Sequence, residues 1–173
     1  KVLKGQTIGV IGGTGSGKTS LINMIPRFYD ATKGEVLVNG TNVKEYTEEG
    51  LRNKIGIVPQ KAVLFKGTIR SNLLWGNESA TENDLMEALK QAQSYDFVMQ
   101  KENGIDSVVE QNGRNFSGGQ RQRLTIARAL VRKPEILILD DSSSALDYTT
   151  DANLRKEIAK LKDMTVFIVS QRT

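Results

Sequence analysis

The stretch QTIGVIGGTGSGKTSLINMI, residues 6–25, decides the fold. Its first part, QTIGVIG, indicates a short buried strand, and KTSLINMI is typical of the helix that follows. Between them, GGTGSGKT matches the pattern G-x-x-x-x-G-K-[ST], which binds phosphate groups when it joins a strand to a helix. A glycine-rich turn with an exposed lysine is the alternative, and both the spacing and the context disfavour it. The stretch therefore predicts a phosphate-binding loop.

This loop supplies the groups that a nucleotide needs. Glycines let the backbone wrap closely around phosphates, so that its N–H groups and the helix N-terminus bind the anion. Lys18 is placed to reach the β- and γ-phosphates, and Thr19 to offer its hydroxyl to Mg²⁺. The nucleotide-binding residues predicted here are Gly12, Gly13, Thr14, Gly15, Ser16, Gly17, Lys18, Thr19 and Ser20.

Composition limits the chemistry and the class of protein. The 173 residues suit one globular domain, and neither cysteine nor histidine occurs among them. Catalysis must therefore use carboxylates, lysine, hydroxyls, amides and bound cations. A net charge of +4 could indicate nucleic-acid binding, but 24 basic and 20 acidic residues are mixed along the chain, which favours a solvated surface. No apolar run in these residues is long enough to span a bilayer, and the first residues do not have the pattern expected of a signal peptide.

Strands and helices alternate along the rest of the chain. GEVLVNG reads as a strand closed by an Asn-Gly turn, and NKIGIVPQ, EILILD and MTVFIVS read as further strands. A helical region from about residue 66 to residue 133 interrupts them, and Thr81 is a candidate N-cap within it. A helix is also expected near DANLRKEIAKL. This alternation predicts a mainly parallel sheet covered on both faces.

A second possible anion site lies at NFSGGQRQR. Ser117 can cap the helix GGQRQRLTIARALV, and two glycines leave its first N–H groups uncovered. Helix capping alone would also explain the serine. Arg121, Arg128 and Arg132 fall near one helix face and are interpreted as a solvated surface rather than a nucleic-acid stripe.

Five motifs in one order identify a family. GGTGSGKT, VPQ, FSGGQ, LILDD and SALD follow one another as in the nucleotide-binding domain of ATP-binding-cassette (ABC) proteins, which the chain resembles over almost its whole length. RFYDATKGEVLVNG and LFKGTIRSNLLWG look most like the exporter branch. The resemblance implies an α/β fold, namely a P-loop NTPase (RecA-like) core at about residues 1–65 and 134–173. An inserted ABC helical subdomain would occupy about residues 66–133.

The resemblance also carries roles onto residues. Gln60 looks like the glutamine that contacts Mg²⁺ and the attacking water, and Asp140 like the carboxylate that holds the hydrated Mg²⁺. The expected metal contacts are therefore Thr19, Gln60 and Asp140, and ATP and Mg²⁺ are the implied cofactors. Two such domains pair head to tail in this family. The residues expected to contact the partner's ATP are Ser117, Gly118, Gly119, Gln120 and Asp147 of SALD.

Three positions depart from the family pattern. Asp141 stands where a glutamate orients and deprotonates the attacking water, and a missing methylene can cost on the order of 10²-fold in rate. Gln171 stands where a switch histidine is usual, and Gln111 stands where exporters commonly have a glutamate before FSGGQ. The groups expected to act in catalysis are Lys18, Gln60, Asp141 and Gln171. Because two changes fall on the cleavage step, we expect a hydrolysis-impaired site.

The implied function is one half of a heterodimeric exporter at the cytoplasmic face of the cell membrane. Its signature motif would complete a competent site on a different subunit, and a transmembrane domain in the same polypeptide would carry the substrate. An ordinary slow homodimeric ATPase, a translation-factor type of soluble ABC protein and a nucleotide sensor remain alternatives. The DNA-repair type is disfavoured, because the positions from 61 to 116 leave no room for a coiled coil.

The first residue is Lys1 rather than methionine, so we expect a piece of a longer polypeptide. The transmembrane domain and the aromatic residue that stacks on adenine would then lie before it. No nucleic-acid partner is expected.

Overall fold

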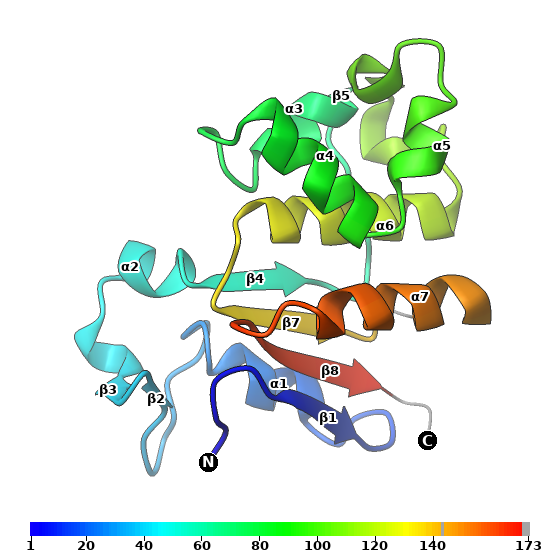
Figure 1. Cartoon of the computed structure of the whole chain (residues 1–173). Helices are drawn as coiled ribbons and strands as arrows, with labels where there is room; N and C mark the ends of the chain where they lie inside the picture. Colours follow the sequence, from blue (N-terminus) through cyan, green and yellow to red (C-terminus); the bar gives the residue numbers. More distant parts are fainter. Residues whose placement is uncertain (143, 171–173) are drawn as a thin grey trace.

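A parallel sheet of four strands forms the centre of the computed structural model, which describes residues 1–142 and 144–170 (Figure 1). Its strands are β1 (Thr7–Ile11), β4 (Ile55–Val58), β7 (Ile136–Asp140) and β8 (Thr165–Ser170). They lie in the order β1-β8-β7-β4, and all neighbours run parallel. The end of β1, where the phosphate loop begins, therefore lies at the same edge of the sheet as Asp140, with β8 between them.

Both faces of the sheet are covered, as the sequence predicts. Alternate residues of β7 enter different clusters, because successive side chains of a strand point to opposite faces. Leu137 and Leu139 join a buried cluster that includes residues of α6 (Gly118–Val131) and α7 (Tyr148–Ala159). Ile138 joins a second buried cluster with Ile22 of α1 (Lys18–Asn23).

The predicted helical region, about residues 66–133, includes α6, and its remaining part forms a lobe over α6 on the side away from the sheet (Figure 1). It contains α3 (Ile69–Leu74), α4 (Glu82–Gln91), α5 (Tyr95–Met99) and a small antiparallel ribbon of β5 (Gly67–Thr68) with β6 (Val108–Val109). Thr81 caps α4 as predicted, in a reciprocal capping box with Asp84. Short 3-10 turns occur at Val43–Glu45, Gly104–Asp106 and Gln111–Gly113.

Two local predictions differ from the structure. The helix expected over KTSLINMI ends at Asn23, because Pro26 lacks an N–H and disfavours helical backbone before it. GEVLVNG does not join the main sheet; only β2 (Leu37–Val38) is extended, and it pairs with β3 (Thr41–Asn42). Asn39 and Gly40 both have positive φ, of 52° and 80°, and this turn folds the chain back on itself.

The arginines of α6 are not a solvated stripe, so that interpretation was wrong. Arg121, Arg128 and Arg132 are half-buried and donate hydrogen bonds to backbone carbonyls of neighbouring segments. Arg132, for example, reaches the carbonyls of Gly76 and Arg52 at 3.1 and 2.9 Å. These side chains tie α6 to α2 (Glu48–Arg52) and to the segments flanking α3. These contacts are structural because they hold α6 against its neighbouring segments, although one buried nitrogen of Arg128 has no hydrogen-bond partner among the described residues.

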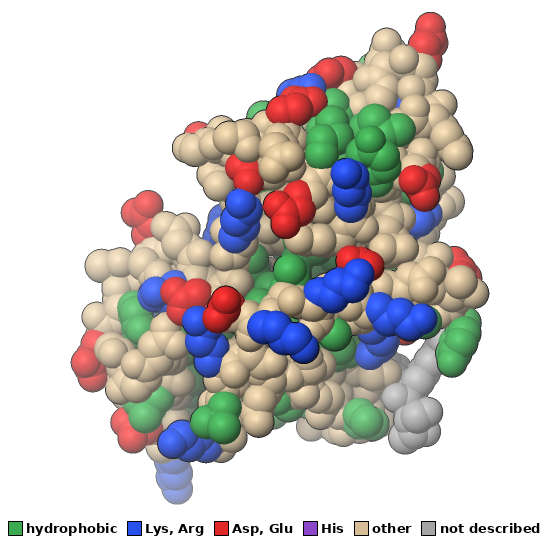
Figure 2. All heavy atoms as spheres, viewed as in Figure 1, with side chains coloured by type: hydrophobic (Ala, Val, Ile, Leu, Met, Phe, Trp, Pro, Cys, Tyr) green, Lys and Arg blue, Asp and Glu red, His purple; other side chains and the backbone are tan. Residues whose placement is uncertain are grey.

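Charge on the molecular surface is mixed. On the face shown in Figure 2, basic and acidic side chains lie among one another rather than in a single-sign field. Within the described ranges, every helix is too short or too polar to cross a bilayer.

Candidate functional site

The phosphate loop joins β1 to α1, as predicted. Gly15 and Gly17 have φ of 77° and 85°, in the left-handed region that glycine enters without the steric penalty of a Cβ. Gly17 is the N-cap of α1, and its carbonyl accepts from the N–H of Leu21. The loop therefore ends where the first N–H groups of a helix lack partners within the helix.

Lys18 is folded back onto this loop. Its Nζ donates to the carbonyl oxygens of Gly12 and Gly13, at 2.6 and 2.7 Å, and approaches the hydroxyl of Ser16 at 3.3 Å. An ammonium group has three donors, and the loop satisfies them with its own oxygens. The cation is thus positioned at the centre of the loop, where an incoming phosphate would compete for the same hydrogen bonds.

Thr19 and Asp140 meet although 121 positions separate them. The Thr19 hydroxyl donates to the Asp140 carboxylate, with distances of 3.1 Å to Oδ2 and 3.3 Å to Oδ1. Hydroxyl and carboxylate oxygens are ligands that Mg²⁺ accepts, and Mg²⁺ usually takes few protein ligands together with phosphate oxygens and water. Among the described residues, no three acidic side chains gather as a metal site. The pair therefore fits Mg²⁺ that arrives with a nucleotide.

Asp141 follows directly and adopts an unusual backbone conformation. Its φ is 47°, its N–H donates to the carbonyl of Val169 at 3.0 Å, and its carbonyl accepts from the Ser144 hydroxyl at 2.9 Å. Aspartate and asparagine are several-fold enriched among the non-glycine residues that adopt a left-handed backbone conformation. The turn thus offers a local reason for aspartate at this position.

The Asp141 carboxylate accepts a hydrogen bond from Gln60, the other residue expected to contact the attacking water. Gln60, just beyond β4, donates from Nε2 to Asp141 Oδ2 at 3.1 Å. The two residues lie 81 positions apart and follow the ends of neighbouring strands, β4 and β7. Gln60 and Asp141 are thus close enough together to act on one water molecule.

These residues line one cavity of about 300 Å³. Its lining consists of Thr14, Gly15, Ser16, Gly17, Lys18, Thr19, Ser20, Gln60, Asp140, Asp141 and Val169. Sequence reasoning missed Val169, because its place beside Asp140 follows from strand order. Gln171, the fourth expected catalytic group, lies outside the described residues.

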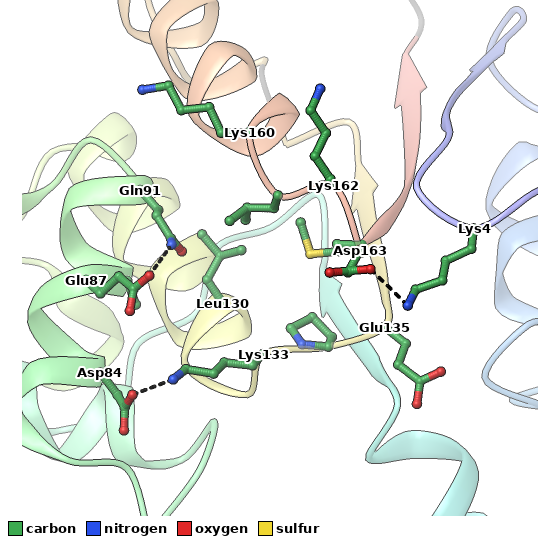
Figure 3. A pocket seen from close by; sticks show the side chains of 14 residues that line it. Lys4, Asp84, Glu87, Gln91, Leu130, Lys133, Glu135, Lys160, Lys162 and Asp163 are labelled. Atoms are coloured by element: carbon green, nitrogen blue, oxygen red, sulfur yellow. Dashed lines mark hydrogen bonds and ion pairs between the residues drawn. The ribbon is translucent and has the colours of Figure 1, made fainter.

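A larger cavity, of about 540 Å³, lies away from this chemistry, between the α4–α6 side of the lobe and the loop before β8 (Figure 3). None of the predicted site residues lines it. We place the candidate site in the smaller cavity because a cation, carboxylates and a phosphate loop converge there.

The residues expected to serve a partner's nucleotide do not line the phosphate-loop cavity. Ser117 caps α6: its hydroxyl accepts from the N–H of Gln120 at 3.2 Å, and the Gln120 side chain accepts from the N–H of Ser117 at 3.0 Å. Ser117 and Gly118 are exposed. Gly119 packs against the turn before α7, where a Cβ would lie 3.1 Å from the carbonyl oxygen of Ala145.

Asp147 caps α7 at the end of this turn. Its carboxylate accepts from the N–H and the hydroxyl of Thr150, at 2.9 and 2.7 Å. Hydrogen bonds from Thr150, the side-chain one foremost, hold the pKa of the Asp147 carboxyl below its usual range. The aspartate therefore fixes the start of α7 and stays ionised.

Comparison with known proteins agrees with this geometry. The sequence profile of the ABC transporter family matches residues 1–144. The ABC transporter ATP-binding protein YfiB of Bacillus subtilis, named as uncharacterized, is 46% identical over 168 residues, which are 97% of this chain and 29% of that protein. A Staphylococcus aureus protein named as a candidate multidrug export ATP-binding/permease protein is 44% identical over 170 residues, 98% of this chain and 29% of its own length.

A solved structure of an ABC exporter has the same fold as this chain. The structure of a bacterial Atm1-family ABC exporter with ATP bound superposes with a TM-score of 0.93 at 34% identity, covering 99% of this chain and 30% of that one. The chain thus spans less than a third of the proteins it resembles. With its phosphate loop, the Thr19–Asp140 pair and a P-loop NTPase sheet in place, the chain belongs to the ABC transporter family, as an ATP-binding domain similar to those of bacterial exporters.

Proposed function

We propose that the chain binds ATP with Mg²⁺ at the phosphate loop and, paired head to tail with a second nucleotide-binding domain, powers export across a membrane. The observation that carries this proposal is the convergence of Lys18, the Thr19–Asp140 pair and the Gln60–Asp141 pair on one cavity. Bound Mg²⁺ supplies positive charge to the phosphate oxygens.

Each residue has a distinct task in this proposal. Lys18 exchanges its bonds to the loop carbonyls for bonds to the β- and γ-phosphates. The Thr19 hydroxyl and the Asp140 carboxylate contribute oxygen ligands, and Gln60 adds an amide oxygen. Asp141, oriented by Gln60, accepts a proton from the attacking water.

We further propose that hydrolysis at this site is slow. The Asp141 side chain is one methylene shorter than glutamate, its backbone sits in a left-handed turn, and its carboxylate is already engaged by Gln60. A base that is displaced by about 1 Å loses on the order of 10²-fold in rate. Glutamine at position 171, in place of histidine, removes a group that could become cationic.

The partner in this proposal is a different subunit whose own site hydrolyses ATP. Exposed Ser117 and Gly118, at the capped start of a long helix, would bind ATP held by that partner together with Gly119, Gln120 and Asp147. This arrangement is supported by the absence of all five from the cavity around Lys18.

A transmembrane domain of the same polypeptide would dock on an aromatic groove of about 350 Å³. Phe65 and Trp75 stack there with ring centroids 4.5 Å apart, and Trp75 remains 64% exposed. Arg52 and Arg128 also line the groove, and each has a buried guanidinium nitrogen without a hydrogen-bond partner in the described residues. An exposed tryptophan beside arginines is typical of a protein interface, because these residue types are enriched among those that contribute most to binding. In this proposal the chain works at the cytoplasmic face of the cell membrane.

Calorimetry of ATP·Mg²⁺ binding tests the first step. We expect Lys18→Ala to abolish measurable binding, because it removes the cation at the phosphates. Lys162→Ala is the matched control, since Lys162 lines the larger cavity (Figure 3), and it should bind as the parent does. Undiminished affinity in Lys18→Ala would overturn the assignment. Single-turnover hydrolysis, alone and with the partner, then separates a slow enzyme from a sensor that never hydrolyses.

A further inference from the structure

A cavity of about 440 Å³ lies apart from the phosphate loop, between the segment that follows β4 and the start of α6. Residues 60–63 form one side, Arg121 and Gln122 of α6 another, and Asn112, Arg114 and Ala145 complete it. We call it the α6 pocket. It touches Gln60 of the candidate site and Gly118 of the signature motif.

One side chain in the α6 pocket has an unused donor. Gln122 is 1% exposed, and its Nε2 is buried without a hydrogen-bond partner in the described part of the chain. Buried polar groups in native proteins are nearly always hydrogen-bonded, and one that is not requires an explanation, of which a bound water or ion is one. Elsewhere on α6, Gln120 is used in the cap and the Thr125 hydroxyl donates to the carbonyl of Arg121, whereas Arg123 and Arg128, which do not line this pocket, each also have a buried nitrogen without a partner among the described residues.

The charges that line the α6 pocket are all positive. Lys61, Arg114 and Arg121 line it, and no aspartate or glutamate does. Arg114 pairs with Glu110, which lies outside the lining. The described structure contains no ion pair for Lys61 or Arg121; Arg121 Nη1 donates to the carbonyl of Phe116 at 2.8 Å.

The larger cavity in Figure 3 shows how a balanced lining differs. There Lys133 pairs with Asp84 at 2.6 Å, and Lys4 with Asp163 at 3.0 Å. The lining of that cavity has as many acidic as basic side chains, whereas the α6 pocket holds two cations without an ion pair beside a buried amide donor. A ligand of the α6 pocket should therefore be an anion with several acceptor oxygens.

We propose that the α6 pocket binds a small free oxyanion, a phosphate or a short dicarboxylate, through Gln122 Nε2, Lys61 and Arg121. Charge-assisted hydrogen bonds from the two cations supply affinity, and the amide fixes the orientation. An occupant would hold residues 60–63 against α6, and with them the Gln60 that bonds to Asp141. The binding step does not depend on the proposed slow hydrolysis, so the two can fail separately.

Calorimetric titration with inorganic phosphate and with succinate tests the proposal. The chain carries Lys18→Ala in every sample, so that anion binding at the phosphate loop does not contribute to the measured heat. We expect one site, weakened about tenfold by Gln122→Met, which keeps the volume but removes the donor, and lost in Lys61→Glu, which reverses an exposed charge. Lys162→Ala, in the balanced cavity, should leave binding unchanged.

A second measurement guards against misfolding of the Gln122 variant. In NMR spectra of the Lys18→Ala chain, the side-chain amide resonance of Gln122 should shift as the anion is titrated. In the Lys18→Ala, Lys61→Glu double variant the same titration should leave that resonance unchanged. Absence of binding by both anions would overturn the proposal. So would binding that leaves the Gln122 resonance in place or survives Lys61→Glu, because it would then be an adventitious ion only.

Discussion

Asp141→Glu tests whether the left-handed turn is what makes aspartate suitable at the catalytic position. A left-handed conformation costs an ordinary residue about 1–2 kcal/mol, and aspartate loses less because its short side chain hydrogen-bonds locally. With φ of 47° at Asp141, we expect glutamate to lower the free energy of unfolding by about 1 kcal/mol. For a chain of this size that corresponds to a fall in Tm of about 2–4 °C.

Thermal unfolding followed by circular dichroism measures this change, with two controls. Asp141→Asn keeps the side-chain length and the tolerance for positive φ, so its Tm should stay within about 1 °C of the parent. Asp163→Glu makes the same chemical change at an ion-paired residue whose side chain is 94% exposed and whose φ is not positive. If Asp141→Glu is as stable as Asp163→Glu, the backbone of this turn does not favour aspartate.

The same substitution also changes the expected rate of ATP hydrolysis. Glutamate restores reach to the water, and Gln171→His restores a group able to carry charge, so we expect the double variant to raise the single-turnover rate by up to about 10²-fold. Each single change should recover much less, because groups that act as a unit are not additive. A double variant as slow as the parent, opposite an intact partner signature, would refute the assignment of slow hydrolysis to these two residues.

Three further outcomes are expected. Ser117→Arg should reduce steady-state ATPase of the complex more than Asp141→Ala, because Ser117 serves the partner's competent site; a larger loss from Asp141→Ala would contradict the proposed asymmetry. Leu124→Ala, at a residue 1% exposed in the core beneath the lobe, should cost about 2–5 kcal/mol of unfolding free energy in urea, and a loss under 1 kcal/mol would argue against that packing. Lys133 and the Thr81 cap hold the pKa of Asp84 well below its usual value of 3.8, so its stabilisation is present above about pH 4 and lost as the pH falls further. Asp84→Asn should therefore show a smaller fall of Tm from pH 5 to pH 3 than the parent, and an equal fall would exclude this linkage.

Sequence reasoning predicted the features that depend on neighbouring residues. Thr81 and Ser117 are helix caps because each side chain reaches the N–H three positions on, and that reach depends only on local backbone. The phosphate loop is equally local, since glycines at fixed spacing allow the backbone angles it needs. Short apolar runs likewise predicted β4, β7 and β8, because composition and length are properties of a single segment.

Tertiary structure alone decided which of these segments meet. GEVLVNG has the pattern of a sheet strand, yet it forms a separate hairpin, since pairing depends on the partner and not on the strand. The Thr19–Asp140 and Gln60–Asp141 hydrogen bonds join residues 121 and 81 positions apart, and Val169 enters the site only through the strand order β1-β8-β7-β4. An amphipathic face shows that a strand or helix is buried, but it does not show which element packs against it. The order of the motifs therefore indicates the type of chemistry, whereas the packing of the elements determines the distances between the catalytic side chains.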